Sequence, residues 1–196
     1  MIDSHFRGLW QRIFFDRLAL FCARYSLLPH HLTILALILG LLCLPALYFH
    51  ERLLAVIVLI LSGILDATDG TLARKLKRSS NSGAILDIAC DRAVEAAVVL
   101  GLYLYDPLNR GLLCLLLLSS FYLCVTTFLL SGIFSANTSN KSFHYNAGLI
   151  ERTETFIFFP IVILWDKAFF WASIVFMTLV FLTAFLRLRE MLKQHA

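Results

Sequence analysis

The sequence predicts an all-α integral membrane protein in which six transmembrane helices follow an N-terminal amphipathic helix at the membrane interface. Hydrophobic residues make up 60% of the 196 residues and charged residues only 15%, and the mean hydropathy is +0.81, which is far from the composition of a soluble domain. The apolar residues fall into six stretches, each near the roughly 20 residues that cross a bilayer. We therefore expect one domain over residues 1–196, with an interfacial helix over 1–28 and a six-helix bundle over 29–190.

The N-terminal segment, from about residue 6 to residue 25, mixes apolar residues at helical spacing with four arginines. This pattern is typical of an amphipathic helix that lies in the membrane interface. The scattered charges differ from the continuous apolar core of a signal peptide, so we expect no cleavage. Pro29 disfavours helix at Leu28 and fits the first turn of a new helix, which predicts that the bundle starts there.

The six apolar stretches are separated by short polar or basic connections. Their approximate ranges are 32–49, 53–73, 84–105, 111–134, 147–165 and 168–187. About twelve Arg and Lys residues lie in the N-terminal segment, the 74–82 loop, the loop near Lys141 and the C-terminal tail, against about three in the other connections. Because basic loops stay on the cytoplasmic side, both termini are predicted to be cytoplasmic. The alternation also favours an even number of spans.

Composition argues against several other kinds of protein. The basic residues cluster between apolar runs and do not alternate with base-stacking aromatic residues, so we expect no nucleic-acid partner. Five cysteines form no CxxC pattern and lie mostly in apolar runs, so neither a disulfide framework nor a zinc site is expected. These residues are Cys22, Cys43, Cys90, Cys114 and Cys124.

The segment from Asp66 to Asp91 concentrates acidic residues at membrane depth, where ionised carboxylates are costly and are normally paired or bound to a cation. Asp66 and Asp69 are three residues apart and Asp87 and Asp91 four apart, so each pair shares one helix face. The midpoint of Asp69 and Asp87 is residue 78, and that of Asp66 and Asp91 is 78.5. This symmetry predicts two antiparallel neighbouring helices whose acids lie at one depth, roughly 10–15 Å below the loop.

Four converging carboxylates predict a site for divalent cations. Oxygen ligands suit Mg²⁺, Mn²⁺ or Ca²⁺, whereas zinc normally takes His or Cys. A pair of such ions can stabilise the attacking and leaving oxygens of a phosphoryl displacement. Gly70 and Ala73 leave room for a ligand near the backbone, Arg74 supplies a fork suited to phosphate, and Gly83 would allow close helix packing.

The spacing Asp66-x₂-Asp69-Gly70-x₂-Ala73-Arg74-x₈-Gly83-x₃-Asp87-x₃-Asp91 resembles, at every defined position, the signature of the CDP-alcohol phosphotransferases. The six-span layout and the N-terminal helix are also similar to those of the family. The resemblance implies that the four aspartates, Asp66, Asp69, Asp87 and Asp91, hold two divalent ions, Mg²⁺ or Mn²⁺. It implies that Asp91 deprotonates the attacking alcohol. Donor contacts are implied for Gly70 and Arg74, with Ser80 as a further candidate.

The run Pro29-His30-His31-Leu32-Thr33 looks like the short Pro-Asn-x-x-Thr turn that borders the nucleotide in this family, with His30 in place of the usual Asn. Pro29 and Thr33 are therefore further candidates for donor binding. The implied reaction is in-line attack by an alcohol on the lipid-bearing phosphorus of CDP-diacylglycerol, with CMP leaving, in phospholipid biosynthesis. The resemblance also implies a homodimer among membrane lipids. We expect a prokaryotic inner membrane and a site that opens to the cytoplasm.

The acceptor is expected to be a polyol phosphate, such as glycerol 3-phosphate or inositol phosphate. Relatives that use serine usually carry Ser-Phe-Gly after the last aspartate, whereas here Arg92 follows Asp91. A phosphorylated acceptor needs cations, and the candidates are Lys141, His144 and Arg152. Three alternatives stay open: serine as acceptor, a CDP-amino alcohol as donor and, in another class of protein, a cation-coupled transporter. The sequence assigns no role to Glu95, Glu151 and Glu154.

Overall fold

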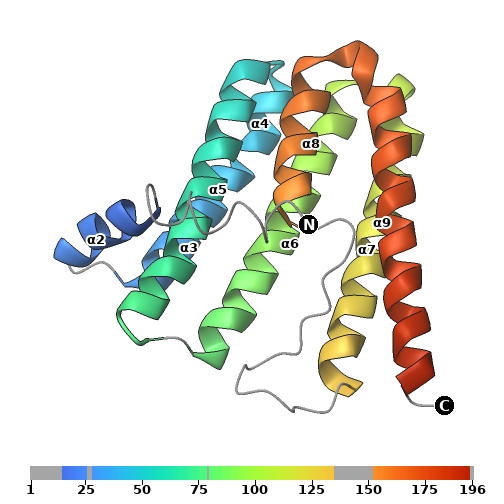
Figure 1. The fold of residues 1–196 in the computed structure, drawn as a ribbon. Helices are drawn as coiled ribbons and strands as arrows, with labels where there is room; N and C mark the ends of the chain where they lie inside the picture. The colour runs from blue at the N-terminus through green and yellow to red at the C-terminus, as the bar shows by residue number, and fades with distance from the viewer. Residues whose placement is uncertain (1–14, 26–27, 79, 135–151, 195–196) are drawn as a thin grey trace. The chain divides into compact units, whose positions relative to one another are not determined.

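The computed structural model describes residues 15–25, 28–78, 80–134 and 152–194, and the regular structure in these ranges is helical (Figure 1). The chain divides into two compact units, Ile2–Pro107 and Leu108–Ala196. The helices are α2 (Asp16–Arg24), α3 (Pro29–Leu41), α4 (Cys43–Tyr48), α5 (Arg52–Lys75), α6 (Asn81–Tyr105), α7 (Pro107–Phe134), α8 (Arg152–Leu164) and α9 (Asp166–Gln194).

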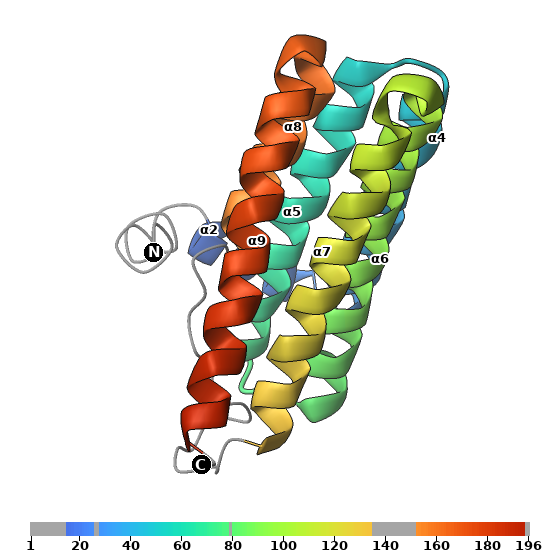
Figure 2. The ribbon, with the colours of Figure 1, turned by 90° about the vertical axis from the view of Figure 1, so that its right-hand side faces the viewer.

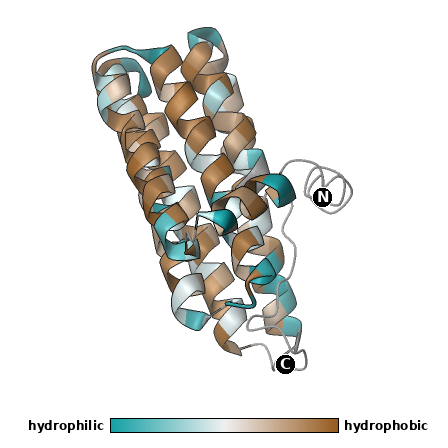
Figure 3. Cartoon of the chain, turned by 90° about the vertical axis from the view of Figure 1, so that its left-hand side faces the viewer, coloured by the Kyte–Doolittle hydropathy of each residue, from teal (hydrophilic) through white to brown (hydrophobic). Residues whose placement is uncertain are grey.

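Hydrophobic residues cover most of the length of the helices, while hydrophilic residues gather near helix ends (Figure 3). Among the described residues, four stretches are long and apolar enough to cross a membrane: Pro29–Tyr48, Arg52–Lys75, Pro107–Phe134 and Asp166–Lys193. A shorter apolar helix covers Glu154–Leu164, and the 25-residue helix α6 carries four charged side chains. The chain is thus an all-helical, multi-pass membrane protein, while six spans stay a prediction.

Helix α3 is central to the N-terminal unit because it packs against both α5 and α6. A Cβ at Gly40 would lie 2.5 Å from Cγ2 of Val94 on α6 and 3.0 Å from Oγ of Ser62 on α5. The Ser62 hydroxyl donates to the carbonyl of Ala36 at 2.7 Å. In a membrane, close backbone approach at small residues and hydrogen bonds between helices are main sources of helix association. The residues Gly40, Ser62 and Ala36 therefore hold three helices together.

Helices α5 and α6, predicted as antiparallel neighbours, approach each other at Asp66, Asp69 and Asp87 but do not pack directly against each other along their length. The short connection between Lys75 and Asn81 does reverse the chain, but α3 and α4 each pack against both helices, and α5 and α6 make no comparable contact with each other. A short loop constrains only the two helix ends that it joins. The lateral spacing of α5 and α6 is set instead by the helices packed against them.

A break at Leu42 divides the first span into α3 and α4. Pro45 accounts for it, since its nitrogen has no proton to donate to the carbonyl of Leu41 and its ring crowds that carbonyl. On either side the helical bonding continues: Leu42 N–H donates to the Ile38 carbonyl at 3.1 Å, and Ala46 N–H donates to the Leu42 carbonyl at 3.2 Å. The two helices therefore form one span with a local interruption.

Helix α2 is the described part of the predicted N-terminal helix, since residues 1–14 lie outside the described ranges. Its Asp16 Oδ1 lies 3.2 Å from Nζ of Lys75 at the end of α5, and Leu20 and Phe21 are exposed. Burial raises the pKa of the Cys22 thiol. A small apolar cluster attaches α2 to α3 and α5, and its buried members are Ala19, Cys22, Leu32 and Leu72.

In the C-terminal unit, α7 and α9 run side by side (Figure 2), and aromatic side chains of the two helices contact each other. The ring of Phe121 on α7 lies 6.0 Å from that of Phe176 on α9 and 6.2 Å from that of Phe159 on α8. At the first turns of α7 and α9, Arg110 Nη2 lies 2.5 Å from Asp166 Oδ1. This ion pair ties together the N-terminal ends of the two helices.

Candidate metal centre

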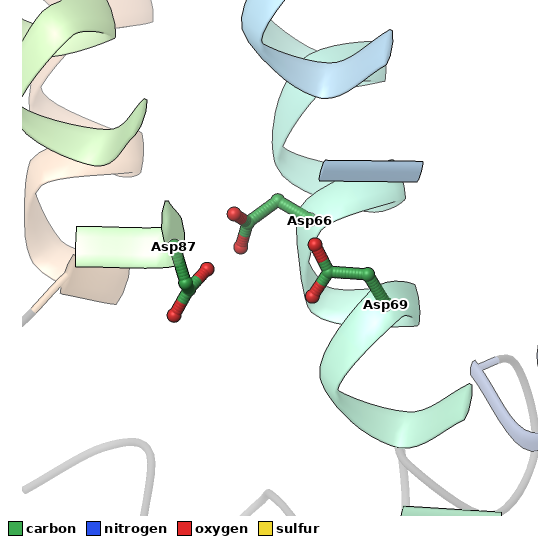
Figure 4. Close-up of side chains that lie close together, drawn as sticks. All are labelled: Asp66, Asp69 and Asp87. Carbon is green, nitrogen blue, oxygen red and sulfur yellow. The ribbon is translucent and has the colours of Figure 1, made fainter. Parts of the chain in front are cut away.

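Three carboxylates from α5 and α6 point toward one another (Figure 4). One oxygen each from Asp66, Asp69 and Asp87 lies within 4.8 Å of the other two. Asp66 and Asp69 are buried, at 8% and 6% exposure, and Asp87 is half-buried. The α5 residues share a helix face because they are three positions apart, and α6 supplies Asp87 from the opposite side.

The charge of this acid cluster, Asp66, Asp69 and Asp87, favours a bound cation. Two unit charges 4.8 Å apart repel by about 3 kcal/mol at an effective dielectric constant of about 20. A divalent ion offsets this repulsion. Because all three donors are carboxylate oxygens, the cluster fits Mg²⁺ or Mn²⁺ better than zinc. The structure brings these three residues together, and their role as metal ligands stays a prediction.

Asp91 lies one helical turn beyond Asp87 on α6, is half-buried, and is not part of the acid cluster. The sequence placed Asp66 and Asp91 at the same depth, as it did Asp69 and Asp87. Equal depth fixes a position along the helix axis but leaves the lateral distance open, and α3 and α4 set that distance. The roles of Asp91 as metal ligand and base stay predictions.

Thr33 on α3 contacts the acid cluster. Its hydroxyl donates to Asp69 Oδ2 at 2.5 Å, and both side chains are buried. The same hydroxyl lies 3.2 Å from the carbonyl oxygen of Pro29. Sequence reasoning assigned Thr33 and Pro29 to the donor nucleotide, which stays a prediction, and it missed the bond to Asp69.

The guanidinium of Arg74 folds back along α5 beside Gly70. Its Nη2 donates to Thr71 Oγ1 at 3.1 Å, and its Nη1 lies 3.5 Å from the position that a Gly70 Cβ would take. No other described atom outside the local helix backbone comes within 4 Å of that position. The chain thus offers an open stretch of backbone next to a guanidinium, an arrangement that fits a phosphate group.

Ser80 caps the N-terminal end of α6. Its Oγ accepts a hydrogen bond from the Gly83 N–H at 3.1 Å. Among the described residues beyond the local helix backbone, a Cβ at Gly83 would meet only this oxygen, at 3.2 Å. The prediction of close helix packing at Gly83 is therefore wrong, because the glycine lies in an exposed first turn. The donor-binding role of Ser80 stays a prediction.

Some of the remaining site residues predicted from the sequence lie outside the described ranges. Lys141, His144 and Glu151 lie outside the described residues, and Arg152 begins α8 with a side chain that is not described. Glu95, which had no assigned role, pairs with Arg92, with Oε2 and Nη1 2.7 Å apart.

Arg187 on α9 is a buried cation that sequence reasoning did not single out. The residue is 8% exposed. Its Nη1 lies 3.6 Å from Cys124 Sγ and its Cζ 5.7 Å from the centre of the Phe128 ring. None of the carboxylates in the described part of the chain pairs with it. Sequence reasoning did not identify it, because an arginine at the end of an apolar stretch is also typical of an interface anchor.

Known proteins resemble this chain in sequence and in fold. The family model described as CDP-alcohol phosphatidyltransferase matches residues 26–185, which confirms the resemblance found in the sequence. The inner membrane protein YnjF of Escherichia coli is 32% identical over 166 residues, which cover 81% of this chain and 80% of that protein. The archaetidylinositol phosphate synthase of Pyrococcus horikoshii is 31% identical over 106 residues, 54% of this chain and 56% of that enzyme.

A solved structure has the same fold. The crystal structure of the Mycobacterium tuberculosis phosphatidylinositol phosphate synthase with CDP-DAG bound aligns with a TM-score of 0.76 at 20% identity, over 91% of this chain and 93% of that chain. The same synthase in complex with manganese and citrate also aligns with a TM-score of 0.76, over 90% of this chain and 88% of that chain.

Proposed function

The chain belongs to the CDP-alcohol phosphatidyltransferase family, and from this we propose that it transfers the phosphatidyl group of CDP-diacylglycerol to a polyol phosphate, with release of CMP. The observation that carries the proposal is the acid cluster, two members of which, Asp66 and Asp69, lie on the same helix as Gly70 and Arg74. Inositol phosphate is the favoured acceptor, with glycerol 3-phosphate second. Two relatives support this order, since their names describe synthases of phosphorylated inositol lipids.

On the donor side, the four aspartates would hold two divalent ions, Mg²⁺ or Mn²⁺, which stabilise charge on the attacking and leaving oxygens. Arg74 binds the diphosphate of the donor through its guanidinium. The missing side chain at Gly70 lets the diphosphate approach the backbone. Pro29, Thr33 and Ser80 border the nucleotide.

On the acceptor side, Asp91 takes the proton of the attacking hydroxyl as the new O–P bond forms. The bond between the lipid-bearing phosphorus of CDP-diacylglycerol and the bridging oxygen of CMP breaks, and CMP leaves with the electron pair. Catalysis of this kind depends mainly on positioning and charge stabilisation. Lys141, His144 and Arg152 bind the acceptor phosphate.

For the membrane arrangement we propose one domain with six spans and α2 in the interface. Both termini and the opening of the site face the cytoplasm of a prokaryotic cell, and the protein is a homodimer in its inner membrane. The orientation is supported by the distribution of basic residues. The interfacial position is supported by the exposed Leu20 and Phe21 on α2 and the basic residues Arg17 and Arg24 on the same helix.

The proposal is tested by measuring CMP release from CDP-diacylglycerol with purified protein. Inositol phosphate, glycerol 3-phosphate, inositol and serine are offered in separate reactions with Mg²⁺ or Mn²⁺. We expect release with a phosphorylated polyol only, and loss of release on chelation. Asp91→Asn should lower the rate by about 100-fold or more, as expected for a general base.

Each alternative predicts a different pattern. Release with serine alone would show an amino-alcohol acceptor. Lipid synthesis from a CDP-amino alcohol and diacylglycerol would show a different donor. Folded protein that is silent with every pair, yet moves cations in proteoliposomes, would support the transporter.

A further inference from the structure

The bond between Thr33 and Asp69 links the start of the first span to the acid cluster. The two residues are 36 positions apart in the chain, and each is 6% exposed. Bulk water therefore does not compete for the hydroxyl or for the carboxylate oxygen that it meets. The contact lies wholly within the N-terminal unit.

The single hydroxyl proton of Thr33 has two acceptors within reach. The Asp69 Oδ2 is 2.5 Å away and the Pro29 carbonyl oxygen 3.2 Å away. A carboxylate is the stronger acceptor and gives the shorter bond. Threonine in a helix commonly donates to the carbonyl four residues earlier, as buried Thr68 does to Ile64 at 2.7 Å. Thr33 departs from that pattern because Asp69 lies opposite it.

The helix segments around this bond are held in place by the apolar cluster under α2. Leu32, next to Thr33, is buried together with Leu72, which lies three residues after Asp69. Ala19 of α2 belongs to the same cluster. The packing of α2 thus fixes the distance between the start of α3 and the end of α5, over which the hydrogen bond forms.

We propose that Thr33 is a positioning residue for the metal centre. Its hydrogen bond fixes the side-chain torsions of Asp69, so that the carboxylate faces Asp66 and Asp87 before a cation arrives. The inference rests on the proposed function in that it takes the acid cluster to be a divalent-metal site. Hydrogen-bond partners of metal ligands typically contribute about ten- to hundredfold in metal affinity.

The test is the affinity of the full-length protein for Mn²⁺ in the absence of nucleotide and acceptor, measured from the electron paramagnetic resonance signal of free Mn²⁺. Thr33→Val, which removes the hydroxyl and keeps the shape, should weaken binding by about ten- to hundredfold. Thr33→Ser, which keeps the hydroxyl, should retain most of the affinity. Thr68→Val is the matched control, since its buried hydroxyl bonds only to its own helix, and it should bind Mn²⁺ as the unaltered protein does.

The variant Asp87→Asn distinguishes a failure of the positioning role of Thr33 from a failure of the proposed metal site. If it weakens Mn²⁺ binding while Thr33→Val does not, the positioning role is wrong and the proposed function stands. If neither substitution changes Mn²⁺ binding, the acid cluster is not the metal site and both proposals fail. A rise in the donor KM of Thr33→Val with unchanged Mn²⁺ affinity would show that Thr33 contacts the nucleotide instead. Should Thr33→Val fail to fold, a comparison of Thr33→Ala with Thr33→Ser decides the same question.

Discussion

Lys77 has a φ of 53°, a left-handed conformation in which a side chain with a Cβ is strained. Its N–H donates to the Arg74 carbonyl at 3.2 Å, and the Arg78 N–H donates to the Ala73 carbonyl at 2.9 Å. These two bonds form the Schellman motif that ends many helices, in which the left-handed position is usually glycine. The motif closes α5 and starts the return to α6, so it helps to bring Asp87 opposite Asp66 and Asp69.

Replacing Lys77 by glycine should stabilise the protein, because glycine adopts this conformation without the Cβ clash. We expect Lys77→Gly to raise the free energy of unfolding by about 1 kcal/mol. The measurement is thermal unfolding in detergent. Lys77→Ala removes the same charge but keeps the Cβ, so it should give no comparable gain. Equal effects of the two substitutions would attribute the change to charge and contradict the conformational explanation.

For single residues, the sequence predicts how deep a side chain lies along its helix. It does not predict contacts that depend on how a helix is rotated about its own axis. Asp66, Asp69 and Asp87 could be predicted because the rise per residue and a short loop fix their depth. The bond of Thr33 to Asp69 depends on how α3 is rotated about its axis. The apolar run after Thr33 is hydrophobic on all sides, so its pattern does not define a preferred face.

Among the helices, the closest approach involves Gly40, where α3, α5 and α6 meet. Gly40→Ala would place a methyl group 2.5 Å from Val94 Cγ2 and 2.7 Å from Cγ1, so one helix must move. We expect a loss of about 1–3 kcal/mol in stability, the usual cost of overpacking. The double variant Gly40→Ala with Val94→Ala should recover part of it, because the second change removes both clashing atoms. Thermal unfolding of the four proteins in one detergent measures this coupling, and strictly additive losses would contradict direct contact.

In the described residues each of the six apolar stretches is helical, the first as the two helices α3 and α4, because run length is a strong signal for a span. The interruption at Leu42 was not predicted, although Pro45 is its visible cause. Helix partners were harder to predict than helices. In lipid, apolar residues do not favour one neighbour over another, and contacts are decided by small residues such as Gly40 and Ser62. For that reason the sequence predicted α5 and α6 as neighbours but did not predict that α3 and α4 contact both.

For the whole molecule, the proposed six spans depend on α6, because its four charged residues all lie within residues 87–95, near the middle of the helix. A charged residue at the centre of a lone helix costs about 2.5–3.5 kcal/mol for insertion. In α6, Asp87 faces carboxylates of α5 across the proposed metal site, and Arg92 pairs with Glu95. These partners reduce the free-energy cost of burying the charged residues of α6, so α6 can cross the membrane although it carries these charges.

Crossing by α6 predicts that exposed positions at its two ends lie on opposite sides of the membrane. Single cysteines are introduced at Arg78 and at Leu108, both exposed, in a protein whose native cysteines are replaced by alanine. With a membrane-impermeant maleimide, Leu108→Cys should react in intact cells, and Arg78→Cys only after the membrane is permeabilised. Reaction of both in intact cells, or of neither, would place the two ends on one side, so that α6 does not span and the count of six fails. Reaction of Arg78→Cys alone would keep the span but reverse the orientation, and would move the opening of the metal site away from the cytoplasm.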